Sequence, residues 1–167
     1  MANQLNILIT GGAGYLGSTL APALLADGHK VTVLDNFLFN QAPLNHIVAA
    51  PNFTPVRGDA RDETALKPHV KNADVVIPLA AMVGAPLCDR DKTAAVTVNR
   101  DAVDTLCKLL SKTQRLLMPI TNSGYGIGQP GKPVTEKDSL NPLSLYGRTK
   151  VEAHSGRHAE HGREPEA

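Results

Sequence analysis

The sequence lacks tryptophan and has only three phenylalanines and three tyrosines among its 167 residues. A core built from this chain must therefore be mainly aliphatic. The sequence also lacks an excess of charge of either sign, because 17 Lys and Arg against 16 Asp and Glu leave a formal net charge of +1 with neutral histidines. Nucleic acids and anionic membranes are bound mainly through clustered positive charge. The composition therefore favours neither of them as a partner.

Long hydrophobic runs are missing as well. No apolar run approaches the roughly 20 residues that a membrane helix needs. Residues 1–4 lack the positive region of a signal peptide, and the apolar run at residues 5–9 is too short to be one. We therefore expect a cytoplasmic protein without a membrane partner. Cys88 and Cys107 have no C-x-x-C spacing, so we expect two reduced structural thiols.

The sequence does contain short β-branched runs that alternate with helical patterns. The predicted strands are residues 5–10, 30–34, 53–57, 74–79 and 116–121, and the predicted helices are residues 15–26, 92–110 and a last helix from about 144. One helical turn is expected near residues 44–48. Alternating strands and helices predict an α/β fold with a parallel sheet and right-handed crossovers.

A glycine-rich turn follows the first predicted strand. Residues 10–17 read T-G-G-A-G-Y-L-G and contain G-x-G-x-x-G at Gly12, Gly14 and Gly17. Glycine permits the tight turn, and the following helix N-terminus offers amides and partial positive charge to a pyrophosphate. Asp35 ends the second predicted strand, where a carboxylate can bind ribose hydroxyls and repel a 2′-phosphate. The pattern predicts a Rossmann-type doubly wound sheet, with strand order 3-2-1-4-5, that binds NAD rather than NADP.

Tyr146 and Lys150 are four residues apart in the last predicted helix, and thus lie on one face of it. A free tyrosine has a pKa of about 10 and is a poor base at neutral pH. A nearby ammonium and a cationic nicotinamide ring would favour the phenolate. On its own, Y-x-x-x-K is more often a surface pair, but its position after the fifth predicted strand makes Tyr146 a candidate acid/base.

Residues 5–153 resemble the short-chain dehydrogenase/reductase superfamily, in its extended branch of NAD-dependent nucleotide-sugar epimerases and dehydratases. The matching segments are T-G-G-A-G-Y-L-G at 10–17, Asp35-Asn36, Gly58-Asp59, Leu79-Ala80-Ala81, Asn99, T-N-S-G-Y-G at 121–126 and Y-G-R-T-K at 146–150.

This resemblance implies a role for each matching residue. Thr121 would be the catalytic Ser/Thr, with Ser123 as a second candidate, while Tyr146 would be the acid/base and Lys150 would bind the nicotinamide ribose and lower the pKa of Tyr146. Asn99 would organise the site rather than take part in the chemistry. The cofactor would be held by Gly11, Gly14, Tyr15, Leu16, Gly17, Asp35, Asn36, Asp59, Ala60, Leu79, Ala80, Ala81, Asn99, Tyr146 and Lys150. Asp59, at the end of the third predicted strand, would lie beside the adenine and accept a hydrogen bond from its amino group, although taken alone Asp59 is more often a turn residue.

The implied reaction transfers hydride from a sugar carbon to NAD⁺ while Tyr146 takes the hydroxyl proton, and hydride later returns from the other face. The substrate would be a nucleotide-diphosphate sugar. Dehydratases of the branch usually carry Asp-Glu directly after the catalytic threonine, whereas this chain has Asn122-Ser123, which favours an epimerase. A nucleotide-sugar 4,6-dehydratase and a non-catalytic NAD-binding module are the alternatives. The resemblance also implies a possible homodimer through the helix that carries Tyr146 and Lys150.

The resemblance ends before the sixth strand and the substrate domain of that family. Residues 154–167 contain no large apolar side chain, two glycines and a proline, which predicts a mobile polar tail after an incomplete NAD-binding domain at 1–153. His154, His158 and His161 could share a helical face, but such a polar, glycine-containing segment makes a metal site an unfavourable reading. We expect a truncated or frameshifted chain with weak or no activity alone.

Overall fold

The computed structural model describes residues 3–40, 42–128 and 131–161, with side chains up to residue 155. These residues belong to two compact units. The sheet unit comprises Met1–Ala80 and Thr105–Pro119, and the helical unit comprises Ala81–Asp104 and Ile120–Ala167.

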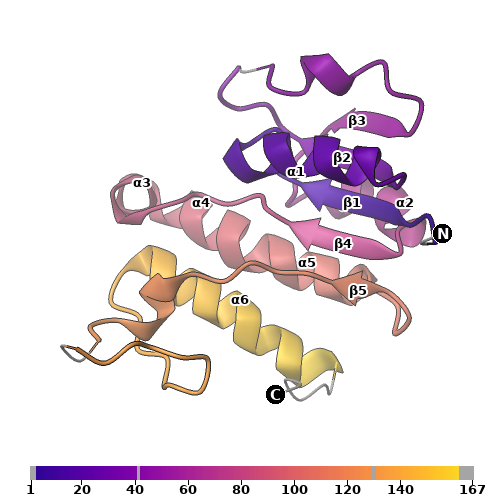
Figure 1. The fold of residues 1–167 in the computed structure, drawn as a ribbon. Helices are drawn as coiled ribbons and strands as arrows, with labels where there is room; N and C mark the ends of the chain where they lie inside the picture. The colour runs from indigo at the N-terminus through magenta and orange to yellow at the C-terminus, as the bar shows by residue number, and fades with distance from the viewer. Residues whose placement is uncertain (1–2, 41, 129–130, 162–167) are drawn as a thin grey trace. The chain divides into compact units, whose positions relative to one another are not determined.

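The sheet unit is built around five parallel strands. They are β1 (Asn6–Thr10), β2 (Lys30–Asp35), β3 (Phe53–Arg57), β4 (Val75–Pro78) and β5 (Arg115–Leu116). Their order across the sheet is β3-β2-β1-β4-β5 (Figure 1), which confirms the predicted strand order. Ile9 of the central strand lies opposite Val33 of β2 and Ile77 of β4. Because the strands are parallel, their carboxyl ends meet at one edge of the sheet.

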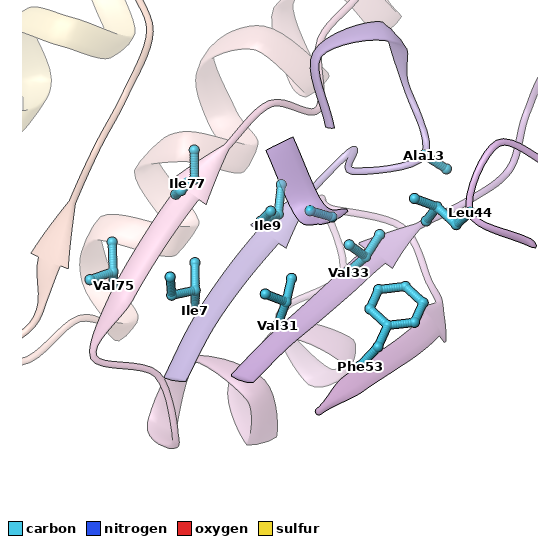
Figure 2. Packing of buried hydrophobic residues seen from close by; sticks show 10 residues of the cluster. Ile7, Ile9, Ala13, Val31, Val33, Leu44, Phe53, Val75 and Ile77 are labelled. Atoms are coloured by element: carbon cyan, nitrogen blue, oxygen red, sulfur yellow. The ribbon is translucent and has the colours of Figure 1, made fainter. Parts of the chain in front are cut away.

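Both faces of the sheet are covered by aliphatic side chains, which explains why β1, β2 and β4 read as continuous apolar runs. On one face, the paired side chains of β1, β2 and β4 stand side by side (Figure 2) and pack with Ala21 of α1 (Tyr15–Ala26). On the other face, Leu8 and Val76 pack with Leu66 of α2 (Glu63–Lys71) and Leu106 of α5 (Ala102–Leu109). The predicted aliphatic core is confirmed, with Phe53 as its one buried aromatic residue among those described.

The helix α2 (Glu63–Lys71) was not expected from the sequence. The Asp62 side chain caps it by accepting a hydrogen bond from the Thr64 amide at 2.9 Å, and Leu66 and Val70 form its buried face. Pro68 lies inside this short segment and obscures the helical pattern. The turn expected near residues 44–48 is present as the 3-10 helix η1 (Asn45–Ile47).

The strand β5 is shorter than predicted, because it covers Arg115–Leu116 instead of residues 116–121. The Leu117 amide still donates to the Val76 carbonyl at 2.9 Å. Beyond it, Pro119 has no amide to donate, and the neighbouring strand β4 ends at Pro78. Thr121 therefore lies outside the sheet, at the start of η3 (Asn122–Tyr125).

The helical unit contains the other site segments. The helix expected at 92–110 is present as α4 (Lys92–Val96), the π-helix η2 (Thr97–Asp101) and α5 (Ala102–Leu109), with the boundary between the units inside α5. A short helix that was not expected, α3 (Ala85–Arg90), precedes them. The last helix, α6, runs over Leu145–His161.

The predicted division of the chain at residue 153 falls within α6, which continues to His161. Residues 162–167 lie outside the described residues, so the mobility expected of 154–167 stays a prediction. The domain bounds 1–153 and 154–167 stay a prediction for the same reason.

Candidate functional site

The glycine-rich turn joins β1 to α1 with its backbone pressed against the sheet. The Gly11 amide donates to the Leu34 carbonyl at 2.8 Å, and Gly11 has a φ of +69°. A Cβ atom at Gly11 would overlap the backbone of Ala80, and a Cβ at Gly17 would overlap the backbone of Gly12. Only glycine fits these two places, so the sequence motif produces a turn whose backbone other segments can approach closely.

The start of α1 is an open group of hydrogen-bond donors. The regular bonds of the helix begin with the Ser18 amide, which donates to the Gly14 carbonyl at 2.9 Å. The amides of the first turn before it have no acceptor within the helix, and the N-cap residue Gly14 supplies no side chain to cap them. Tyr15 and Leu16 are exposed. Such a helix start is suited to an anionic group.

Asp35 links the end of β2 to the glycine turn. Its Oδ2 accepts a hydrogen bond from the Ala13 amide at 2.9 Å, and its Oδ1 accepts one from the Phe37 amide at 2.8 Å. The sequence predicted a ribose ligand at Asp35 but not these two bonds. An ionised carboxylate offers about four acceptor positions. Two of them therefore remain for the hydroxyls of a ribose.

The other predicted adenosine contacts lie beyond β2 and β3. Asn36 is exposed, and its Oδ1 accepts a hydrogen bond from the Leu38 amide at 3.0 Å. Asp59 accepts bonds from Arg61 through the backbone amide, Nε and Nη2 at 2.9, 2.9 and 2.6 Å. The Arg61 side chain lowers the pKa of Asp59. Ala60 is buried beside it. A role for Asp59 toward adenine stays a prediction, since Arg61 already occupies most of its carboxylate.

The predicted site residues are divided between the two units. The sheet unit holds Gly11, Gly14, Tyr15, Leu16, Gly17, Asp35, Asn36, Asp59, Ala60, Leu79 and Ala80, and the helical unit holds Ala81, Asn99, Thr121, Tyr146 and Lys150. Those of the sheet unit follow the carboxyl ends of β1, β2, β3 and β4, where the edge of a parallel sheet gathers them. The glycine turn, the open helix start and the free acceptor positions of Asp35 fit the pyrophosphate and ribose of a dinucleotide.

Asn99 lies in the π-helix η2, and its side chain is 1% exposed. Its Oδ1 accepts a hydrogen bond from the Met82 amide at 2.8 Å, and its Nδ2 donates to the Met82 carbonyl at 3.0 Å. Nδ2 also donates to Thr149 Oγ1 at 3.3 Å. The side chain is thus occupied by protein groups on both its oxygen and its nitrogen, next to Ala81.

Tyr146 and Lys150 lie in the first turns of α6, Tyr146 half-buried and Lys150 6% exposed. Burial lowers the pKa of Lys150. No carboxylate among the described residues forms an ion pair with its Nζ. A buried ammonium of this kind acts strongly on neighbouring groups, because little water screens it.

Thr121 is held close to α6 through η3. Its Oγ1 accepts a hydrogen bond from the Ser123 amide at 3.2 Å, so the hydroxyl proton stays available for donation. A Cβ atom at Gly147 would lie 2.8 Å from the Ser123 carbonyl oxygen. The glycine in Y-G-R-T-K therefore lets α6 pack directly on η3. Gly147 belongs to the matching segment at 146–150, but its spacing alone does not reveal this packing role.

Two absences concern only the part of the chain that the structure describes. Within it, no three His, Cys, Asp or Glu side chains gather so that they could hold a metal ion. In the same residues, no helix has both the length and the apolar character needed to cross a membrane.

Comparison with known proteins adds a family match. The family model described as the NAD dependent epimerase/dehydratase family matches residues 7–162. The chain is 32% identical over 143 residues to a UDP-N-acetyl-alpha-D-glucosaminuronate decarboxylase of Bacillus cytotoxicus, covering 85% of this chain and 42% of that protein. It is 33% identical over 150 residues to a UDP-glucose 4-epimerase of Mycolicibacterium smegmatis, covering 86% and 47%.

The same family resemblance is found among solved structures. The crystal structure of UDP-glucuronic acid 4-epimerase from Bacillus cereus in complex with NAD is similar with a TM-score of 0.84 and 28% identity. The similarity covers 95% of this chain and 52% of that one. The chain therefore spans about half the length of the relatives that it matches.

Proposed function

Because the chain belongs to the NAD dependent epimerase/dehydratase family, we propose that it is a NAD-dependent epimerase of a nucleotide-diphosphate sugar. The observation that carries the proposal is the family match over residues 7–162, and the residues expected to bind and react are present within that range. The relatives named above act on UDP-sugars, which makes a UDP-sugar the first substrate to test.

The sheet unit supplies the residues for the adenosine and pyrophosphate parts of NAD. The free amides at the start of α1 would bind the pyrophosphate, where the helix dipole adds to their hydrogen bonds. Asp35 would accept hydrogen bonds from the ribose hydroxyls through the acceptor positions that Ala13 and Phe37 leave open. Its negative charge would repel the extra phosphate of NADP.

The helical unit supplies the proton-transfer groups. When bound, NAD would supply the acceptor and the later donor of the hydride. Tyr146 takes the proton of the reacting sugar hydroxyl, and the hydroxyl of Thr121 donates a hydrogen bond to the same oxygen. The ammonium of Lys150, which no carboxylate among the described residues pairs with, would bind the nicotinamide ribose.

The residues after Thr121 favour an epimerase within the family. A dehydratase must remove water from the sugar, which requires additional acid and base groups beside the catalytic threonine. Here the two positions are Asn122 and Ser123, so neither carries a carboxylic acid. Asn122 is exposed, and the Ser123 amide donates a hydrogen bond to Thr121 Oγ1. This supports reversible oxidation without elimination.

The test is incubation of the full chain with NAD and either UDP-glucose or UDP-glucuronic acid, followed by proton NMR of the sugar. We expect the C4 epimer to form, and we expect Tyr146→Phe to abolish its formation while leaving NAD binding intact. Accumulation of a keto-deoxy sugar would indicate a dehydratase instead. Saturable NAD binding without any sugar conversion would contradict the enzyme and indicate an NAD-binding module.

A further inference from the structure

We propose that Thr149 is a positioning residue, whose hydroxyl fixes the turn of α6 that carries Tyr146 and Lys150. This inference rests on the proposed function, which assigns chemistry to those two residues and none to Thr149. Thr149 is 1% exposed, so its hydroxyl interacts with protein groups rather than with bulk water.

The direction of each hydrogen bond at Thr149 follows from its partners. Oγ1 lies 3.0 Å from the Tyr146 carbonyl oxygen, which can only accept, so the hydroxyl proton is used there. Oγ1 lies 3.3 Å from Asn99 Nδ2, which can only donate, so the hydroxyl accepts this second bond. The buried hydroxyl of Thr149 therefore donates one hydrogen bond and accepts another.

The Asn99 amide is itself held in one orientation. Its oxygen faces the Met82 amide at 2.8 Å and its nitrogen faces the Met82 carbonyl at 3.0 Å, so exchanging the two would put like groups together. Asn99 sits in the π-helix η2, an irregularity that is frequent at functional sites. A continuous chain of bonds therefore runs from Met82 through Asn99 and Thr149 to Tyr146.

One bond of this chain, from Asn99 Nδ2 to Thr149 Oγ1 at 3.3 Å, joins α6 to η2 and opposes rotation of α6 about its axis. Thr149 lies three residues after Tyr146 and directly before Lys150, and its buried face continues at Ala153, which is 0% exposed. A rotation of the helix would move the phenol and the ammonium together. Productive proton transfer depends on geometry held to fractions of an ångström. The hydroxyl of Thr149, rather than its methyl group, is the part that prevents such a rotation.

Two substitutions separate the hydroxyl from the shape of the side chain. Thr149→Val keeps the branched shape but removes the bond from Asn99 Nδ2 and the bond to the Tyr146 carbonyl, whereas Thr149→Ser keeps the hydroxyl. Thr97→Val is the matched control, because the Thr97 hydroxyl donates to the Ala94 carbonyl at 3.3 Å, also three residues earlier in a helix of the same unit.

The experiment measures kcat and KM for the UDP-sugar, and the pKa of Lys150 by NMR of chains labelled at the lysine Cε. For Thr149→Val we expect kcat to fall roughly tenfold or more with little change in KM, because the two buried hydrogen bonds of the Thr149 hydroxyl are lost. We also expect its Lys150 pKa to rise toward the ordinary value as water enters. Thr149→Ser and Thr97→Val should match the wild type in both measurements.

The two measurements distinguish a failure of the proposed function from a failure of this inference. If the chain converts no sugar, the proposed function fails, and the Lys150 pKa still decides whether the Thr149 hydroxyl fixes this turn. A wild-type Lys150 pKa in Thr149→Val would overturn the inference, as would an equal change in Thr97→Val. If Thr149→Val does not fold, Thr149→Ser decides alone, because a large loss of kcat in a variant that retains the hydroxyl would contradict it.

Discussion

Lys150 is a charged side chain that the fold buries without a carboxylate partner among the described residues. Removing an ammonium from water costs free energy unless hydrogen bonds or an opposite charge compensate. The lowered pKa of Lys150 expresses this cost, because burial disfavours the charged form. The buried ammonium therefore lowers the free energy of unfolding, and its proposed role in the reaction is a reason to keep it.

Lys150→Met tests this conflict. The thioether side chain fills a similar volume without a charge, so we expect the free energy of unfolding to rise by about 1 kcal/mol near neutral pH. Sugar conversion should be lost. Urea unfolding of both chains measures the stability difference, and a clearly less stable Lys150→Met chain would show that the ammonium is stabilising.

The pH dependence of that difference has a defined sign. The folded chain holds the Lys150 proton less tightly than the unfolded chain, whose lysine titrates near 10.5. The cost of burial is therefore present below the folded pKa and is relieved as the pH rises from that pKa toward 10.5. The advantage of Lys150→Met should shrink over this window in urea unfolding at increasing pH, and an advantage that grows would contradict the account.

Single residues differ in how far the sequence predicts them. Gly17 and Asp35 could be identified because their roles follow from local conformation and from spacing along the chain. The bond from Asp35 to the Ala13 amide and the bond from Asn99 to Thr149 join positions 22 and 50 residues apart. Such contacts depend on how the elements pack, and no local pattern encodes them.

At the scale of elements, the packing of α6 on η3 decides where Tyr146 lies. Gly147 is buried, and a Cβ atom on it would lie 2.8 Å from the Ser123 carbonyl oxygen, which leaves no space for a side chain. Gly124 makes the same contact from the other side, since a Cβ there would lie 3.0 Å from Val151 Cγ2. Two glycines thus allow the Thr121 segment and the Tyr146 helix to approach each other.

Gly147→Ala should destabilise the chain even though alanine is the better helix former. In an open helix this substitution stabilises by about 1 kcal/mol, but here the added methyl group must displace a backbone carbonyl, which typically costs about 1–3 kcal/mol. The midpoint temperature of thermal unfolding and kcat should both fall. Gly128→Ala is the matched control in the same unit, because its Cβ would lie 3.5 Å from Val134 Cγ2, an ordinary contact distance. Equal effects of the two variants would contradict this role for Gly147.

Elements were predicted best where their apolar pattern was long and uninterrupted. The strands β1, β2 and β4 and the helix α1 were found near their observed bounds because both faces of the sheet demand apolar residues. The helix α2 was missed because Pro68 interrupts a nine-residue segment with only two buried positions. The strand β5 was predicted to be longer than it is, because apolar residues continue along the chain past the point where Pro119 ends the pairing.

At the scale of the whole molecule, binding and chemistry are assigned to different units. The expected dinucleotide contacts belong mainly to the sheet unit, and the expected proton-transfer groups belong to the helical unit. The chain spans about half the length of its relatives, so the complete proteins contain segments that this one does not match. The residues expected to contact NAD are present in this chain, so a measurement of NAD binding tests their assignment.

The most direct measurement is calorimetric titration of the chain with NAD, repeated with Asp35→Ala and with Asp27→Ala. Asp27 is exposed at the other end of α1, so its substitution removes the same charge without touching the predicted ribose site. We predict saturable binding that Asp35→Ala weakens by about 10- to 100-fold, as expected for hydrogen bonds to a charged group, and that Asp27→Ala leaves unchanged. No saturable binding by the folded chain, or equal binding by Asp35→Ala, would contradict the account.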